Sequence, residues 1–225
     1  MGKDNQPKHR QQARDLRRRA AHREPYERLL IVCEGAKTEP RYLDEIRRDF
    51  RLATAHVQVW PSALGTQPIQ VVEYAELLFR EGDRAKGFEG GAFDRIYAVF
   101  DRDDHASYHQ ALNKADALDG KLKNDEGNRV PFHSVASVPC FELWLLQHFE
   151  DVHAPLHRAL VYERLKVYLP AYDKGQGGHW EATKSRLEDA VRRARVRAAA
   201  TQAHDGVQPY TAIHELVLRL VNLNT

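Results

Sequence analysis

The sequence predicts an α/β protein in which helices flank a parallel sheet, with a mostly helical C-terminal portion after the sheet. Two observations predict this fold class. Between residues 28 and 138, short apolar segments rich in β-branched and aromatic residues alternate with amphipathic segments. After Pro139 the amphipathic segments follow one another with no strand between them. Strand–helix alternation of this kind is typical of parallel sheets that are covered on both faces.

The first half of the chain contains the predicted sheet. Each expected strand is short, apolar and bounded by turn residues, and these strands are placed at 29–33, 57–60, 96–100 and 130–138. Pro61 closes the second strand, and Pro131 argues for an edge position or a late start of the fourth. Helices are predicted between the strands at 38–50, 68–84 and 105–123. Thr38 and Glu39 fit a cap and a favourable charge at the start of the first helix, and Pro68 suits the first turn of the second.

The second half is predicted to be helical, with helices at about 140–149, 157–169, 180–200 and 211–222. A glycine-rich joint at 175–178 interrupts this half. We therefore divide the chain into a basic flexible arm at 1–25, an α/β domain at 26–150, and a helical region at 151–225 that packs on it.

Composition excludes several classes of protein. The 225 residues carry a formal net charge of only +2, but the charge is uneven, with eight Lys or Arg against two Asp in residues 1–23. Two cysteines cannot form a disulfide framework in a chain of this length, so we expect a reduced, cytoplasmic protein. No apolar run approaches the length of a membrane span, and we expect no membrane partner.

Acidic residues follow two of the predicted strands. Glu34 comes directly after the strand at 29–33, and Asp101, Asp103 and Asp104 follow the strand at 96–100. Because parallel strands end at one edge of a sheet, these carboxylates are expected to share a crevice there. If the backbone stays extended, Asp101 and Asp103 point the same way. Carboxylates held side by side repel one another unless a proton or a cation separates them, and Mg²⁺ is the obvious cation.

The order and context of these residues resemble the Toprim domain, the metal-dependent module of topoisomerases, primases and several nucleases. The segments 33–39 (CEGAKTE), 100–105 (FDRDDH), 137–146 (SVPCFELWLL) and 211–217 (TAIHELV) are similar, more narrowly, to the RloB-like family of bacterial Toprim-type proteins associated with restriction loci and phage defence. This resemblance implies a Toprim-like sheet and a Mg²⁺-dependent (or Mn²⁺-dependent) nuclease. Glu34 would be the general acid/base or a metal ligand, and Asp101 and Asp103 would bind the metal.

Three further residues have open roles. Glu142 or Asp104 would complete a second metal site, although Glu142 also suits the dipole of the helix that it begins. His105 could contact the scissile phosphate or move a proton, or it could simply pack at the start of its helix.

Nucleic acid, either DNA or RNA, is the expected partner. Glycine and basic side chains that could contact phosphates are Gly35, Lys37, Lys174, Arg192, Arg193 and Arg195. A partner ATPase, as for some Toprim defence nucleases, and a homo-oligomer are both left open.

Two alternatives remain at this point. One is a non-catalytic subunit of a defence system that binds nucleic acid or acts as a sensor. The other is a phosphatase with an aspartyl nucleophile, because such enzymes also place Asp-x-Asp after an apolar strand. Those phosphatases carry a hydroxyl residue two positions after the second Asp, where this chain has His105.

Overall fold

In the computed structural model, residues 27–205 and 209–223 are described. The predicted arm at 1–25 lies outside these residues. The central five-stranded sheet has the order β2-β1-β5-β8-β9, and only the last pair is antiparallel. Its strands are β1 (Leu29–Cys33), β2 (Val57–Pro61), β5 (Arg95–Asp101), β8 (Phe132–Val138) and β9 (Tyr210–Thr211). The predicted α/β class with a mostly parallel sheet is confirmed.

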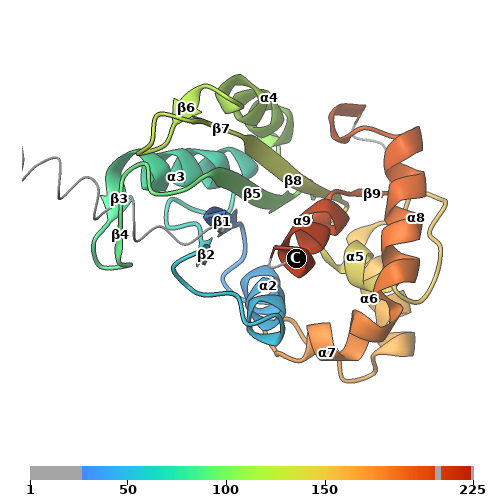
Figure 1. Ribbon diagram of the computed structural model, residues 1–225. Coiled ribbons are helices and arrows are strands. Elements are labelled where there is room, and N and C mark those ends of the chain that lie inside the picture. Colours follow the sequence, from blue (N-terminus) through green and yellow to red (C-terminus); the bar gives the residue numbers. More distant parts are fainter. Residues whose placement is uncertain (1–26, 206–208, 224–225) are drawn as a thin grey trace, which may run out of the picture.

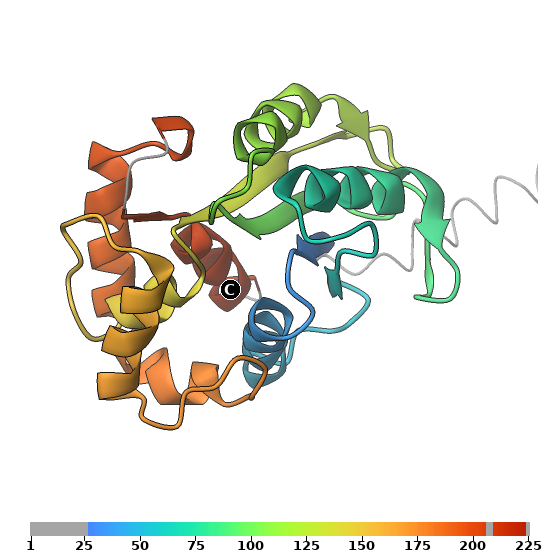
Figure 2. The ribbon, with the colours of Figure 1, turned by 180° about the vertical axis from the view of Figure 1, so that it is seen from behind.

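Helices cover both faces of this sheet (Figures 1 and 2). One face carries α3 (Pro68–Glu81) and α4 (Tyr108–Leu118). The other carries α2 (Thr38–Asp49) and α9 (Ile213–Val221). Around α9 and α2 lie the remaining helices, α5 (Glu142–Gln147), α6 (Arg158–Tyr168), α7 (His179–Thr183) and α8 (Leu187–Ala200). Strand β1 is buried on both faces, which explains its unbroken apolar sequence.

One apolar core joins the second face of the sheet to the C-terminal helices. It contains Ile31 of β1, Tyr42 of α2, Trp144 of α5 and Leu216 of α9. The indole N–H of Trp144 donates to the Tyr42 hydroxyl at 2.9 Å, and both side chains are fully buried. Tyr42 thereby links α2, which follows β1, to α5, which follows β8.

Small elements depart from the sequence prediction. Two hairpins, β3 (Gly82–Asp83) with β4 (Phe88–Glu89) and β6 (Leu122–Lys123) with β7 (Arg129–Val130), replace the predicted ends of two helices. Strand β9 lies where the last helix was expected to begin. Two-residue strands have too little sequence to show a period of two, so only tertiary pairing identifies them.

The prediction of a single helix at 180–200 is also wrong. It is divided into α7, a 3-10 turn η1 (Lys184–Arg186) and α8. The Thr183 hydroxyl donates to the carbonyl of His179 at 2.7 Å, a bond that bends helices. Trp180 is anchored on α2, because its indole N–H donates to Asp49 at 2.7 Å and its backbone N–H donates to Glu45 at 2.9 Å. Helix α7 is therefore held against α2 while α8 turns away toward α5.

Among residues 27–205 and 209–223, no helix combines the length and the apolar character needed to cross a membrane.

Removing the Tyr42 hydroxyl tests the link between the two halves of the chain. In Tyr42→Phe the buried Trp144 N–H loses its acceptor, so we expect the free energy of unfolding to fall by about 1–3 kcal/mol. Urea unfolding measures this loss. The matched control is Tyr168→Phe, whose half-exposed hydroxyl donates to Glu150, and it should change stability by less than about 0.5 kcal/mol. Equal losses in both variants would contradict the role given to Tyr42.

Candidate functional site: an acidic cluster at the carboxyl edge of the sheet

The carboxyl ends of β1 and β5 bring the two principal acidic residues together. The strands are neighbours, with Cys33 beside Val99, so Glu34 follows one strand and Asp101 ends the other. The backbone N–H of Asp101 donates to Oε2 of Glu34 at 2.9 Å. Burial raises the pKa of Glu34, and the nearby charge of Asp103 raises it further. The structure therefore brings Glu34 and Asp101 together at the carboxyl edge of the sheet.

Asp101 belongs to an acidic cluster whose other members are Glu34, Glu39 and Glu142. Its side chain is buried, and burial raises the pKa of its carboxyl group well above the usual range. The negative charges of Glu39, Glu142 and Glu34 raise that pKa further, while a hydrogen bond from the backbone N–H of Phe141 lowers it. Asp101 is therefore surrounded by three other carboxylates.

Glu39 is a member of the cluster that sequence reasoning missed, because it was interpreted as a residue of the helix cap. The first residue of the helix is Thr38, and no side chain caps it. Glu39 is buried, and burial together with the charges of Glu142 and Glu34 raises its pKa to about 7. A Cβ atom at Gly35 would lie 2.5 Å from Oε2 of Glu39. The glycine at position 35 therefore leaves room for the Glu39 carboxylate, and that glycine was the available signal.

Glu142 enters the cluster from the first turn of α5. Only 1% of the residue is exposed. The Tyr172 hydroxyl donates to its Oε1 at 2.6 Å, and the Lys174 ammonium lies 3.5 Å from the same oxygen. Its other oxygen, Oε2, is buried and has no hydrogen-bond partner among the described residues. A buried carboxylate oxygen without a partner is costly, so the fold keeps Glu142 here at the expense of stability.

Lys174, which the sequence predicts to contact nucleic acid, has a half-exposed side chain whose ammonium lies beside the cluster. Besides Glu142, the Lys174 nitrogen lies 4.8 Å from the centre of the Tyr162 ring on α6. Its charge lowers the pKa values of Glu39 and Asp103, against the larger effect of burial. The segment that carries Lys174 lies over the start of α2, where a Cβ at Gly175 would meet the Lys37 side chain at 2.7 Å.

Asp103 lies at the rim of the cluster and not beside Asp101 on a strand. The expectation that both side chains point the same way is wrong, because β5 ends at Asp101 and Asp103 has a φ of +35°. Its carboxylate forms an ion pair with Arg158 of α6, and its Oδ1 is buried without a hydrogen-bond partner in the described part of the chain. Burial raises the pKa of Asp103 although Arg158, Lys174 and His105 act against this.

Asp104 and His105 follow Asp103 in the chain, but only His105 lies close to the acidic cluster. His105 precedes α4, because the helix begins at Tyr108 and not at His105 as predicted. Its Nε2 lies 3.4 Å from Oε1 of Glu34, so the imidazole faces the proposed acid/base residue. Asp104 is exposed in the same turn, outside the group of acids that act on Asp101.

The predicted arginine contacts lie on α8. Arg192 pairs with Asp189 at 2.7 Å, and Arg193 donates to the carbonyl of Gln147 at 2.6 Å. Arg195 is exposed. Arg193 therefore has a structural role at the end of α5, and none of the three appears among the charges that act on Asp101 or Glu39.

The donor set of the cluster suits a hard cation, since all its ligands would be carboxylate oxygens and two of these oxygens are buried without partners. As arranged, no three His, Cys, Asp or Glu side chains of residues 27–205 and 209–223 are grouped so that they could hold a metal ion. Lys174 and Arg158 instead supply the positive charge, to Glu142 and Asp103 respectively. A metal ion that binds Oε1 of Glu142 would have to replace the ammonium of Lys174, which lies beside that oxygen.

The raised pKa of Glu39 predicts how stability depends on pH. Between the ordinary value of 4.5 and about 7, the folded protein binds more protons than the unfolded chain. Stability should therefore fall as pH rises through this range in the absence of divalent metal. Thermal unfolding in EDTA measures the slope, which should be smaller in Glu39→Gln. The exposed Glu89→Gln serves as control and should keep the wild-type slope. An unchanged slope in Glu39→Gln would show that Glu39 does not titrate as the structure implies.

Comparison with known proteins supports the resemblance found in the sequence. No curated protein and no solved structure gives a significant match. A family model described as RloB-like protein matches residues 29–220. The match includes every member of the acidic cluster, from Glu34 directly after β1 to Glu142 on α5, and it spans both the sheet and the C-terminal helices. This chain therefore belongs to the RloB-like protein family.

Proposed function

We propose that the protein is a nuclease that uses Mg²⁺ or Mn²⁺ to hydrolyse phosphodiester bonds. One observation carries the proposal: Glu34, Glu39, Asp101 and Glu142 converge at the carboxyl edge of a parallel sheet, where open α/β folds bind their ligands. Mutual repulsion among these acids is relieved most directly by a divalent cation. When bound, such an ion would neutralise phosphate oxygens and lower the pKa of a coordinated water molecule.

Glu34 is the proposed proton carrier. Its carboxylate is partly exposed, unlike that of Asp101, so it can reach a substrate. Burial raises its pKa, and a carboxyl group with a raised pKa exchanges protons more readily near neutral pH. His105, 3.4 Å away, is positioned to pass a proton to or from Glu34. Asp101, Glu142 and Asp103 would bind the metal.

The biological setting is inferred from the family. Membership of the RloB-like family supports a role in defence against phage, with nucleic acid as the substrate. A partner ATPase that controls the nuclease is compatible with this role. Such control would suit a site in which Lys174 neutralises Glu142 until the substrate and metal arrive.

One observation favours a second candidate, a non-catalytic subunit that binds nucleic acid. Lys174 and Arg158 already neutralise two of the acids, so the cluster persists without a metal. The phosphatase alternative has less support. The Asp101 carboxylate is buried and accepts a hydrogen bond from Phe141, and its pKa is raised well above the usual range, so it would be a poor nucleophile.

Metal-dependent cleavage separates these candidates. Purified protein with Mg²⁺ or Mn²⁺ should cleave plasmid, single-stranded DNA or tRNA, and EDTA should stop the reaction. Glu34→Gln removes the proposed acid/base group and Asp101→Asn removes a proposed metal ligand. Each substitution should lower the rate by roughly 100-fold or more. The controls are Glu89→Gln and Asp116→Asn, two exposed acids outside the cluster, and both should cleave as wild type.

Cleavage that survives EDTA, or that survives both cluster substitutions, would contradict the metal mechanism. Nucleic-acid binding without any cleavage would favour the non-catalytic subunit. Formation of a phosphorylated Asp101 would instead establish the phosphatase.

Metal binding without substrate gives a second test, because substitutions at Glu142 and Lys174 should change the affinity for Mn²⁺ in opposite directions. In isothermal titrations with Mn²⁺, Glu142→Gln should weaken binding by about tenfold or more, since it removes a buried carboxylate. Lys174→Gln should tighten binding, because the ammonium no longer competes for Oε1 of Glu142. If both variants bind Mn²⁺ as wild type does, the metal does not bind at Glu142.

A further inference from the structure

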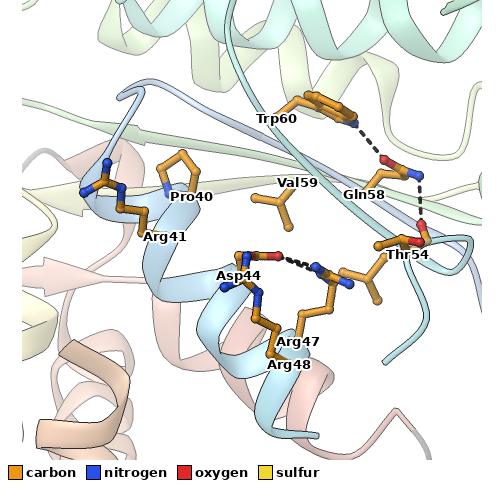
Figure 3. A pocket seen from close by; sticks show the side chains of 10 residues that line it. Pro40, Arg41, Asp44, Arg47, Arg48, Thr54, Gln58, Val59 and Trp60 are labelled. Atoms are coloured by element: carbon orange, nitrogen blue, oxygen red, sulfur yellow. Dashed lines mark hydrogen bonds and ion pairs between the residues drawn. The ribbon is translucent and has the colours of Figure 1, made fainter. Parts of the chain in front are cut away.

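A basic pocket lies on the outer side of α2, against the edge strand β2 (Figure 3). Its volume is about 380 Å³. One wall is the exposed side of α2, including Arg41, Asp44 and Arg48, and the other contains Gln58 and Trp60 of β2. None of the residues assigned to the acidic cluster lines it, so this is a separate site.

The pocket adjoins the acidic cluster through two elements. Pro40 and Arg41, which line the pocket, directly follow Glu39 in the first turn of α2. On the strand side, Trp60 lies beside Val32 of β1, two residues before Glu34. An extended polymer bound in the pocket would therefore reach toward the carboxyl edge of the sheet, where the cluster lies.

Arginine side chains make the pocket positive. Arg47 and Arg48 both pair with the single acid Asp44, at 2.6 and 2.5 Å. Figure 3 shows Arg41 apart from this group, with its guanidinium on the other side of Pro40 from Gln58. Arg41 is exposed, and no hydrogen bond or ion pair of its side chain is found among the described residues. Three guanidinium groups against one carboxylate leave an excess of positive charge for an anion.

An aromatic side chain completes the pocket. Trp60 is half-buried, whereas Trp144 and Trp180 are buried in the core. The Trp60 indole N–H donates to Oε1 of Gln58 at 3.0 Å, which fixes the orientation of the ring (Figure 3). The Lys86 ammonium lies 5.1 Å from the ring centre. Lys86 also pairs with Asp83, and part of the Trp60 ring packs against the core on the α3 side of the sheet. The exposed part of this ring, fixed in orientation beside cationic groups, is suited to stack on an unpaired base next to its phosphates.

We infer that this pocket binds a single-stranded segment of nucleic acid and directs it toward the acidic cluster. Arg41 and Arg48 would contact successive phosphates, and Trp60 would stack on a base. Duplex fits less well, because its bases are already stacked on one another and do not present a free face to Trp60. The direction toward the cluster rests on the proposed nuclease function, while the binding itself does not.

Binding in EDTA tests the pocket without any catalysis. A fluorescein-labelled oligothymidylate is titrated with the full-length protein over a range of salt concentrations, and anisotropy gives Kd. The test variant is the double substitution Arg41→Ala with Arg48→Ala. The matched control is Arg84→Ala with Arg129→Ala, two exposed arginines that lie in the hairpins before β5 and β8.

The double variant should bind at least tenfold more weakly at low salt. The slope of log K against log salt should become shallower by about 1.4, the value for two lost phosphate contacts on a single strand. The control variant should bind as wild type. Trp60→Leu should weaken binding by about tenfold with the salt slope unchanged, because stacking does not depend on counterions. Tryptophan fluorescence should be quenched by the oligonucleotide in wild type and not in Trp60→Leu.

Two results would overturn the inference. The first is equal affinity of the Arg41/Arg48 variant and wild type. The second is tighter binding of a duplex of the same length than of the single strand. If the pocket variants lose binding but the wild type cleaves nothing with Mg²⁺, the pocket stands and the proposed nuclease function fails.

Discussion

The repulsion among acidic side chains at one edge of the sheet is the constraint on which the other features depend. The members of this cluster are Glu34, Glu39, Asp101 and Glu142. Burial and the charges of neighbouring acids disfavour the ionised forms of the carboxyl groups in this cluster. The fold offsets this with hydrogen bonds from the backbone N–H groups of Asp101 and Phe141, and with the Tyr172 hydroxyl. These bonds orient the carboxyl groups but supply no full positive charge to offset the negative charge of the ionised ones. The remaining charge is what would attract a cation.

Both halves of the chain are needed to build this site. The strand ends contribute Glu34 and Asp101, whereas Glu142 comes from the helix after the fourth parallel strand. The C-terminal region supplies the side chains that pair with Glu142 or with Asp103. These side chains are Arg158, Tyr172 and Lys174. The shared core around Tyr42 and Trp144 holds that region against the sheet. A C-terminal truncation would therefore remove the partners of the cluster as well as part of its core.

Local patterns in the sequence were enough to predict the sheet and half of the site. The apolar strands before Glu34 and Asp101 are short and sharply bounded, so their ends, and hence the carboxyl edge, could be predicted. The positions of Glu39 and Lys174 could not, because a first-turn glutamate looks like a favourable charge for the helix dipole and a lysine beside glycines looks like a phosphate contact. Their roles arise only when α2 and the segment after α6 are packed together, as the close approach of Gly175 to Lys37 shows. The break of the helix at Thr183 likewise depends on Trp180 binding to α2, a contact between residues far apart in the chain.

The central claim is that the acidic cluster binds a divalent cation, and diffraction from crystals soaked in Mn²⁺ tests it most directly. The account predicts an anomalous difference peak between the carboxylates of Asp101 and Glu142, with the Lys174 side chain moved away from Glu142. Glu142→Gln crystals soaked in the same way should show a weaker peak or none. A Mn²⁺ peak elsewhere in the molecule, with Lys174 still at Glu142, would contradict the account.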